Sequence, residues 1–463
     1  MDRLTRRRFF QAGLGSTAAL VCNSDSISAS AQKGKTFMEP AQEVPIRGQS
    51  DIIVCGGGPA GAVAAISAAR AGAKVQLLEL QGSLGGVWTS GLLTYIFDFD
   101  KCKIAMEIID RLDKVHARRC KSKRNFVYEP EYMKWILEQM CLEAGVQFRL
   151  HTNVASVHRT GRVIDTIITE SKSGREAWCA PIIIDATGDG DVAARAGCGF
   201  DMGSESDGKE QPLTLNGFAI VRDYTKLTGF ISNIPEMWKP GGHGDSFRKL
   251  LAEIHKTGME PSYFNPTLFQ VHENLLTIMI NHEYNVKADD AQAVSDASVR
   301  ARAEIIQIID GLNKLGGPWE GMRSVHSAEQ IGIRSGRRVH GLYKITKEDV
   351  AAGRRFEDGV TLSRFGIDIH AHDFKTNKKE TIGRGGIKYR PFEVPLRSMI
   401  AKDVDNLILA GRCISGDFIS HASYRVTGSA TAMGETAGIV AAKAVHDKCL
   451  PKEVEWKKQK SGD

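Results

Sequence analysis

The feature that most constrains the fold of this chain is a glycine-rich turn at residues 56–61. The apolar run DIIVC at 51–55 precedes it, and a small-residue stretch at 62–71 follows it. A short apolar run suits a buried parallel strand, and the Ala-rich stretch predicts a helix that Gly72 closes. A second apolar run, KVQLLEL, then ends in Glu79. The segment therefore predicts a strand–turn–helix–strand unit, the start of a parallel α/β sheet.

The glycines of this turn, Gly56, Gly58 and Gly61, have the spacing GxGxxG, with Pro59 and Ala60 between the last two. In such a turn the first glycine permits the tight reversal of the chain. The second lets a pyrophosphate approach the backbone, and the third lets the helix pack close to the strand. The helix N-terminus adds free N–H groups for the phosphates. We therefore predict a dinucleotide site here, with the Glu79 carboxylate accepting hydrogen bonds from ribose hydroxyls.

The character of the chain changes after about residue 205. The next region mixes strand-like runs with one amphipathic helix at 291–310, which predicts an inserted α+β domain that encloses a substrate. A buried strand, NLILA, and a helix of small residues then return to the first domain. The predicted division is a dinucleotide-binding domain at 50–205 and 381–450, a substrate domain at 206–380 and a tail at 451–463.

Three later stretches resemble one family of proteins. They are GIRSGRRVHGLYKIT, the segment PLRS, and AGRCIS followed by YRV. The chain resembles the bacterial generic FAD-dependent oxidoreductases, which are similar to glutathione-reductase and fumarate-reductase flavoproteins. The resemblance covers nearly all the chain after residue 50. It implies a Rossmann-like parallel-sheet domain that binds FAD, and an enzyme that transfers a hydride between the flavin and a small organic substrate.

The resemblance also implies cofactor contacts beyond the first turn. Gly85 and Gly86 form a second glycine pair, in a loop expected to run along the cofactor toward the flavin ring. Val154 belongs to a segment whose backbone would contact the adenine. Ala186 and Gly188 belong to an ATG turn that ends a buried strand in related flavoproteins. Two aspartates beside this turn, at 189 and 191, are expected to cap the next helix.

The C-terminal segment is expected to return to the flavin at Gly411. Related flavoproteins often have AGD here, and Arg412 replaces that aspartate, so it could meet phosphate or ribityl oxygens instead. Asp417 is a nearby substitute for the missing carboxylate. The N-terminus of the following helix, near Val426 and Gly428, could direct N–H groups at the flavin pyrimidine, where negative charge collects on reduction.

Two side chains between this turn and its helix are the predicted catalytic residues. His421 could accept a substrate proton near neutral pH. Arg425 could orient a carboxylate or polarise a carbonyl. A satisfied structural histidine and an ion pair or cofactor contact remain the alternatives for these two residues.

Other charged groups have less distinct patterns. Arg334, Arg337 and Arg338 form a basic cluster that we expect to pair with acids rather than with a substrate. His370 and His372, with Asp368 and Asp373 nearby, are the one cluster that could suggest a metal, and we predict no metal site.

The N-terminus reads as a targeting segment. TRRRFF at 5–10 precedes a short apolar stretch and an A-x-A-like cleavage site, so residues 1–31 predict a signal peptide of the twin-arginine type. Residues 32–49 are expected to form a linker. This predicts an exported, periplasmic enzyme with no transmembrane anchor once the signal is removed.

Composition excludes some functions. The net charge of +6 is modest, so nothing points to nucleic acid. The nine cysteines are scattered singly, without the close pair that a flavin–disulfide mechanism needs. An electron carrier without its own substrate and an NAD-type dehydrogenase remain alternatives. The electron acceptor is not indicated.

Overall fold

The computed structural model describes residues 36–119, 122–234, 242–379 and 382–456. The chain divides into two units, Met1–Glu43 and Val44–Asp463. In the first unit only residues 36–43 are described, and they have no regular secondary structure. The predicted signal peptide at 1–31 lies outside the described residues. Every element below belongs to the second unit.

A five-stranded parallel sheet forms the centre of this unit, as the sequence predicts. Its strand order is β22-β11-β2-β3-β7, and each neighbouring pair is parallel. The bounds are β2 Ile52–Cys55, β3 Val75–Leu78, β7 Gln147–Arg149, β11 Ile182–Asp185 and β22 Leu407–Leu409. Apart from the edge strand β7, these strands are buried and largely apolar runs, which is typical of a parallel sheet covered on both faces.

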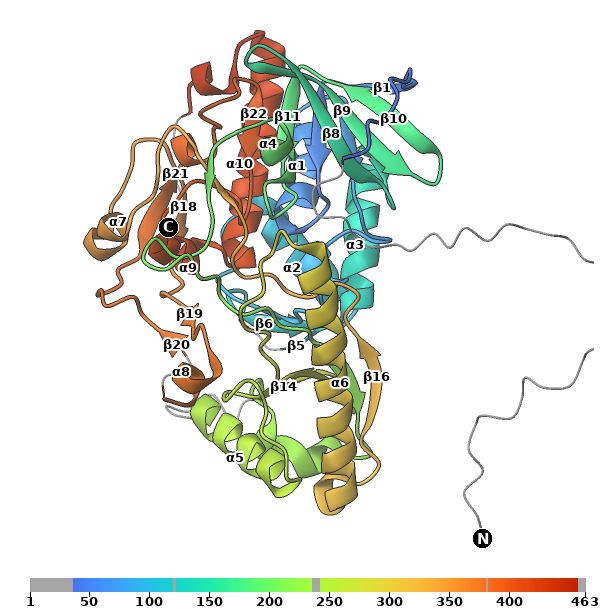
Figure 1. The fold of residues 1–463 in the computed structure, drawn as a ribbon, viewed down its shortest axis with the longest axis vertical. Coiled ribbons are helices and arrows are strands. Elements are labelled where there is room, and N and C mark those ends of the chain that lie inside the picture. The colour runs from blue at the N-terminus through green and yellow to red at the C-terminus, as the bar shows by residue number, and fades with distance from the viewer. Residues whose placement is uncertain (1–35, 120–121, 235–241, 380–381, 457–463) are drawn as a thin grey trace, which may run out of the picture. The chain divides into compact units, whose positions relative to one another are not determined.

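Two helices of small residues pack together against this sheet (Figure 1). They are α1 (Pro59–Arg70) and α10 (Thr427–Asp447), the predicted return of the chain to the first domain. A Cβ atom at Gly434 or Gly438 would overlap backbone atoms of α1. Because glycine has no side chain, the two helix axes can approach closely at these positions. The C-terminal helix therefore becomes part of the dinucleotide-binding domain.

A second sheet has the order β1-β10-β9-β8. Its strands are β1 Ile46–Gln49, β8 Asn153–Thr160, β9 Val163–Ser171 and β10 Gly174–Cys179. The predicted linker at 32–49 is wrong for its last four residues. They have no apolar periodicity, yet they pair with β10 in parallel, because strand pairing satisfies backbone groups whatever the side chains.

The inserted region has its own sheet and its own hydrophobic core. The sheet has the order β14-β15-β13-β16, with β13 Gly217–Ile220, β14 Thr267–His272, β15 Leu275–Met279 and β16 Arg323–Ser327. Two helices, α5 (Gly242–Lys256) and α6 (Ala291–Leu315), accompany it in the lower part of Figure 1. Apart from Leu92, the buried residues of this core lie between Leu213 and Ile331.

Residues from Val339 onward pack in the first core instead of the second. They include α7 (Lys347–Ala352), β18 (Gly359–Ser363) and β21 (Phe392–Pro395). The second core is therefore shorter than the predicted substrate domain at 206–380.

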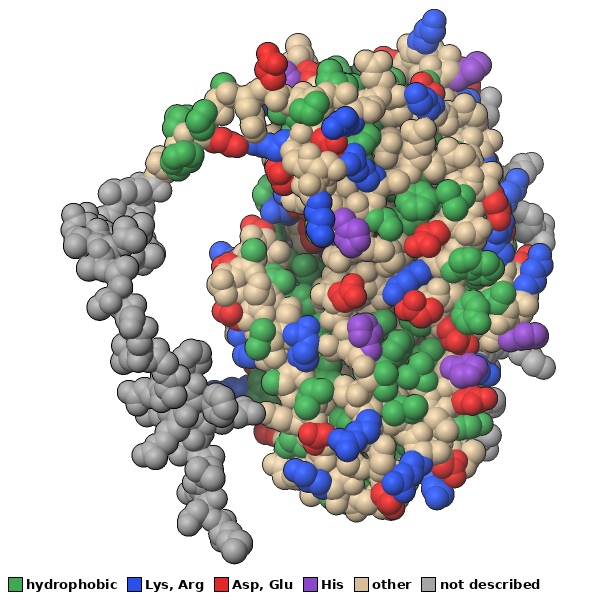
Figure 2. All heavy atoms as spheres, turned by 90° about the vertical axis from the view of Figure 1, so that its right-hand side faces the viewer, with side chains coloured by type: hydrophobic (Ala, Val, Ile, Leu, Met, Phe, Trp, Pro, Cys, Tyr) green, Lys and Arg blue, Asp and Glu red, His purple; other side chains and the backbone are tan. Residues whose placement is uncertain are grey.

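The remaining elements are short or peripheral. The helices are α2 Lys103–Lys114, α3 Pro130–Glu143, α4 Asp191–Arg195, α8 Phe374–Lys379 and α9 Phe418–Tyr424. The strands are β4 Tyr95–Ile96, β5 Arg118–Arg119, β6 Phe126–Tyr128, β12 Phe200–Asp201, β17 Arg338–Val339, β19 Ile369–His370 and β20 Ile382–Gly383. No helix within the described residues is both long and apolar enough to cross a bilayer. On the face in Figure 2, basic and acidic side chains are interspersed.

Candidate active site

One continuous cavity of about 530 Å³ extends from the parallel sheet to the sheet of the inserted region. At its first end the lining residues come from the glycine-rich turn and the ends of the parallel strands. Those predicted to bind the cofactor are Gly56, Gly58, Pro59, Ala60, Glu79, Gly86, Val154, Ala186, Gly188, Gly411, Arg412 and Val426. Open parallel sheets bind ligands at the carboxyl ends of their strands, which is where this end of the cavity lies.

The turn at 56–61 has the geometry of a phosphate cradle. Gly56 has φ +95°, a conformation that strongly favours glycine. A Cβ atom at Gly58 would meet nothing within 4 Å and would project into open space. A Cβ atom at Gly61 would overlap the carbonyl oxygen of Gly56, so Gly61 does not line the cavity but keeps α1 close to the turn. Since α1 begins at Pro59, its free N–H groups lie beside the open position.

Glu79 lies directly after β3 and is 6% exposed. Its carboxylate accepts hydrogen bonds from the backbone N–H of Gly57 and from that of Gln81, the latter at 2.7 Å. Burial raises the pKa of this carboxyl group. These bonds hold the carboxylate at the edge of the cavity, where a ribose hydroxyl could also donate to it.

The turn after β11 brings Arg412 into contact with an aspartate that was predicted to cap a helix. That prediction is wrong. Helix α4 has Gly190 as its N-cap, without a side-chain cap, while Asp189 pairs with Arg412 at 2.6 Å. Asp191 pairs with Arg337 at 3.0 Å. The Arg412 guanidinium lies against Gly188, since a Cβ there would be 3.1 Å from Nη2.

Two further predicted cofactor residues do not line the cavity. Gly85 has φ +105° and donates its N–H to the carbonyl of Gly57 at 2.8 Å, so it supports the glycine-rich turn from behind. Gly428 lies one residue inside α10, where a Cβ would overlap the carbonyl oxygens of Phe97 and Asp98. Both glycines therefore act in packing. The N-terminus of α10 reaches the cavity through Val426 and Thr427 instead.

His421 does not line the cavity, which contradicts its predicted place beside the flavin. Its side chain is fully buried in α9, with the ring 5.4 Å from that of Tyr424. Burial holds its pKa well below the usual value, and the charge on Arg338 adds to this effect. Asp417, the substitute carboxylate, caps α9 by accepting from the N–H of Ser420 at 2.7 Å. The sequence places both residues near the flavin segment, but α9 directs them into the interior.

The second end of the cavity holds a charged group around Asp368. Arg425, the other predicted catalytic residue, donates to the Asp368 carbonyl at 2.8 Å and to its carboxylate at 3.2 Å. The His370 ring lies on the same carboxylate, with Nε2 3.3 Å from Oδ2. All three residues line the cavity. In the sequence, Asp368 and His370 stood out only as members of the small His/Asp cluster that could suggest a metal site.

His370 is the titratable base of this group. It is 5% exposed, and within the described parts of the chain its Nδ1 has no hydrogen-bond partner. If Nε2 carries the proton toward Asp368, then Nδ1 is a free acceptor. Burial and the charge on Arg334 lower the pKa of His370 to about 4, so its imidazole is neutral at physiological pH. His282 packs on it with ring centroids 4.9 Å apart.

The basic cluster separates in space, because the chain at 334–338 is not helical. Arg337 and Arg338 pair with acids as predicted, Arg338 with Glu205 at 3.2 Å. Arg334 does not. Its Nη1 donates to the carbonyl of Pro212 at 2.7 Å and to the hydroxyl of Thr214 at 2.8 Å. Arg334 lines the cavity, so one member of the cluster belongs to the site.

Aromatic side chains form one wall of the same end. Tyr95 stacks on Phe269 with centroids 4.9 Å apart and lies 4.7 Å from Phe97. Phe97 in turn lies 5.2 Å from Phe365. All four line the cavity. This wall offers apolar contacts opposite polar groups that would fix a ligand's orientation, the usual composition of a small-molecule site.

The first end of the cavity suits FAD. A dinucleotide needs space, N–H donors and an acceptor. The open position at Gly58 provides the space, the N-terminus of α1 the donors, and the Glu79 carboxylate the acceptor. No group of three or more acidic, histidine or cysteine side chains within the described residues could hold a metal ion. The seven described cysteines are free thiols.

The comparison with protein families agrees with this assignment. Residues 51–461 match the family model described as FAD dependent oxidoreductase, and the chain belongs to this family. It is therefore an FAD-dependent oxidoreductase that binds FAD, which confirms the predicted cofactor and enzyme class.

Several solved structures are similar to this chain at low identity. A geranylgeranyl bacteriochlorophyll reductase-like protein from Thermoplasma acidophilum is 13% identical, with a TM-score of 0.43 over 86% of this chain and 78% of that one. The flavin-dependent brominase Bmp2 is 12% identical, with a TM-score of 0.45 over 89% of this chain and 81% of that one.

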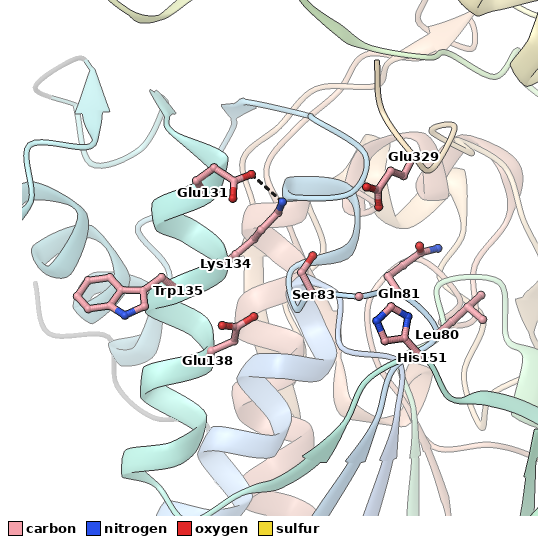
Figure 3. Close-up of a pocket in the computed structure, with 10 residues that line it drawn as sticks. Leu80, Gln81, Ser83, Glu131, Lys134, Trp135, Glu138, His151 and Glu329 are labelled. Atoms are coloured by element: carbon pink, nitrogen blue, oxygen red, sulfur yellow. Dashed lines mark hydrogen bonds and ion pairs between the residues drawn. The ribbon is translucent and has the colours of Figure 1, made fainter. Parts of the chain in front are cut away.

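A second depression, of about 560 Å³, lies on the surface beside the loop after β3 (Figure 3). Leu80 and Gln81 line both it and the main cavity. Within it the Glu131 carboxylate pairs with Lys134 at 2.7 Å and is 81% exposed. It marks the outer end of the cofactor region and offers no buried chemistry of its own.

Proposed function

We propose that this enzyme transfers a hydride between bound FAD and a small organic substrate held at the second end of the cavity. The observation that carries the proposal is the continuity of one cavity. It joins the dinucleotide cradle to a pocket that contains a histidine–aspartate pair, two arginines and an aromatic wall. An electron carrier needs only an accessible flavin edge, whereas a cavity with charged groups and an aromatic wall suits a small-molecule substrate.

Bound FAD supplies the two-electron acceptor or donor, and the side chains supply the rest of the chemistry. The proposed acceptor of the substrate proton, and its donor in the opposite direction, is Nδ1 of His370, which is buried and has no hydrogen-bond partner among the described residues. Asp368 orients the ring and stabilises it when it becomes charged. Arg425, fixed by Asp368, orients the substrate. His370 thus takes the role that the sequence suggested for His421.

Export to the periplasm is the second part of the proposal. Its support is the sequence pattern TRRRFF followed by an apolar stretch and a cleavage-like site within residues 1–31. An export route for folded proteins would let FAD bind before translocation. Replacing Arg6 and Arg7 by Lys should retain the protein in the cytoplasm on cell fractionation. Unchanged periplasmic yield in that variant would contradict a twin-arginine signal.

The experiment for the enzymatic part is an absorption spectrum of purified protein lacking residues 1–31, followed by anaerobic titration with candidate substrates. Bound oxidised flavin gives bands at about 370 and 450 nm, which bleach when a substrate donates a hydride. Bleaching by a small alcohol, amine or acid would support the proposal. A flavin that only external electron-transfer proteins reduce would favour the carrier alternative.

A further inference from the structure

The charges at the second end of the cavity do not balance. Arg334 and Arg425 are both half-buried cations, and desolvation lowers the pKa of Arg425 only to about 10, so it stays charged at neutral pH. Asp368 supplies one negative charge, because His370 and the arginines hold its pKa down against the effect of burial. His370 is neutral. One positive charge is therefore in excess at this end.

The excess falls on groups with unused hydrogen-bonding capacity. Arg334 donates only to neutral oxygens and forms no ion pair among the described residues. Nε of Arg425 is buried without a partner, and so is Nδ1 of His370. A buried charge is unfavourable unless it is paired and hydrogen-bonded. The unused Nε–H donor of Arg425 and the excess positive charge both indicate one anionic ligand group.

The cavity also indicates what kind of anion. Arginine presents a planar fork of N–H donors that matches a carboxylate. A single excess charge suits a monoanion, and the cradle for the cofactor phosphates lies at the other end, around Gly58. The aromatic wall formed by Tyr95, Phe97, Phe269 and Phe365 would hold an apolar body.

We infer that the substrate is a carboxylate with an apolar body, its carboxylate bound between Arg334 and Arg425 and its body against the aromatic wall. The inference rests on the proposed function, since it assigns the substrate class of the same site. It also has a consequence for His370. The arginine charges hold the pKa of His370 down, and a bound carboxylate offsets them. The histidine therefore becomes a stronger base when substrate is present.

The first test compares a charged probe with a neutral one of the same shape. The holoenzyme is titrated with benzoate and with benzamide, and binding is followed by calorimetry and by the shift of the flavin spectrum, both independent of turnover. We expect benzoate to bind at least about 10-fold more tightly. Equal affinity, or tighter binding of benzamide, would overturn the inference.

Variants then locate the carboxylate. Arg334→Gln and Arg425→Gln should each weaken benzoate binding by about 10- to 100-fold and leave the affinity for benzamide unchanged. The matched control is Arg222→Gln, because Arg222 is 69% exposed and pairs with Glu320 away from the cavity. Full benzoate affinity in both site variants would contradict the assignment. If a variant does not fold, the wild-type comparison of the two probes still decides.

The outcomes also separate this inference from the function on which it rests. If the purified protein binds no flavin, the proposed function itself is contradicted. Protein that binds flavin and is bleached by neutral substrates, without preference for benzoate over benzamide, would leave the oxidoreductase in place and remove only the carboxylate.

Discussion

The two ends of the cavity are built in different ways. The cofactor end depends on backbone groups and missing side chains, and its central part, the turn and Glu79, comes from one continuous segment of the chain. The substrate end depends on side chains from separate segments, among them Tyr95, Phe269, Arg334, His370 and Arg425. The first end can therefore be recognised from local spacing, while the second exists only after folding.

This difference predicts different consequences of substitution. A change at the cofactor end alters backbone geometry or the space for the dinucleotide, so it should affect folding or flavin content. A change at the substrate end removes a side-chain function and should leave flavin bound. The following predictions test that distinction, from the largest expected effect to the smallest.

Gly61→Val should prevent stable folding. The new Cβ would overlap the carbonyl oxygen of Gly56, where α1 meets the turn. This oxygen is a backbone atom, so it cannot move aside as a flexible side chain could. We expect a loss of about 3 kcal/mol or more in the free energy of unfolding, measured by chemical denaturation. A native-like denaturation midpoint would mean that the turn can open, contrary to the role assigned to this glycine.

Gly58→Val should instead leave the fold intact and remove the cofactor. A Cβ at Gly58 meets nothing within 4 Å in the protein, so the substitution fills only the space for the pyrophosphate. The measurement is the flavin content of the purified variant beside its thermal unfolding, with wild-type apoprotein as the control for stability. Normal flavin occupancy would show that the cofactor does not pass this residue.

His370→Gln should keep flavin but slow turnover by about 10²- to 10⁴-fold, because it removes the proposed proton acceptor. The measurement is the rate of flavin reduction by a substrate found by anaerobic bleaching. The control is His372→Gln, since His372 lies two residues away and does not line the cavity. Equal rates for the two variants would remove His370 from the mechanism.

The contribution of His370 to the stability of the apoprotein should fall as the pH falls from about 6.5 to 4. The folded pKa of His370, about 4, lies below its value of about 6.5 in an unfolded chain. Between these values the unfolded state binds a proton that the folded state does not, which favours unfolding by roughly 1 kcal/mol per pH unit. His282 and His421, whose pKa values are also lowered by burial, act in the same direction.

Denaturation midpoints measured across this range check that slope. His370→Gln should reduce it, while His446→Gln, at a ring that is 88% exposed, should not. The same slope in the wild type and in His370→Gln would mean that His370 is protonated in the folded protein.

The dinucleotide-binding fold could be predicted from the sequence because its signals are local. The strand at 52–55, the GxGxxG turn and Glu79 occur within thirty residues, and each has one structural meaning in that order. Strand β1 could not be found in this way, since IRGQ has no apolar pattern and depends on its partner β10. The same applies to the boundary near Val339, where the chain leaves the second core without a change in composition.

For this protein the sequence by itself determined the fold class, the cofactor and the enzyme class, because glycine spacing and strand–helix order act over short distances. Only the tertiary structure decided which charged side chains line the second end of the cavity. It turned His421 into the interior, since α9 buries that face, and it joined Asp368, His370, Arg334 and Arg425 at one cavity. Side-chain convergence depends on how distant segments pack, and no local pattern encodes it.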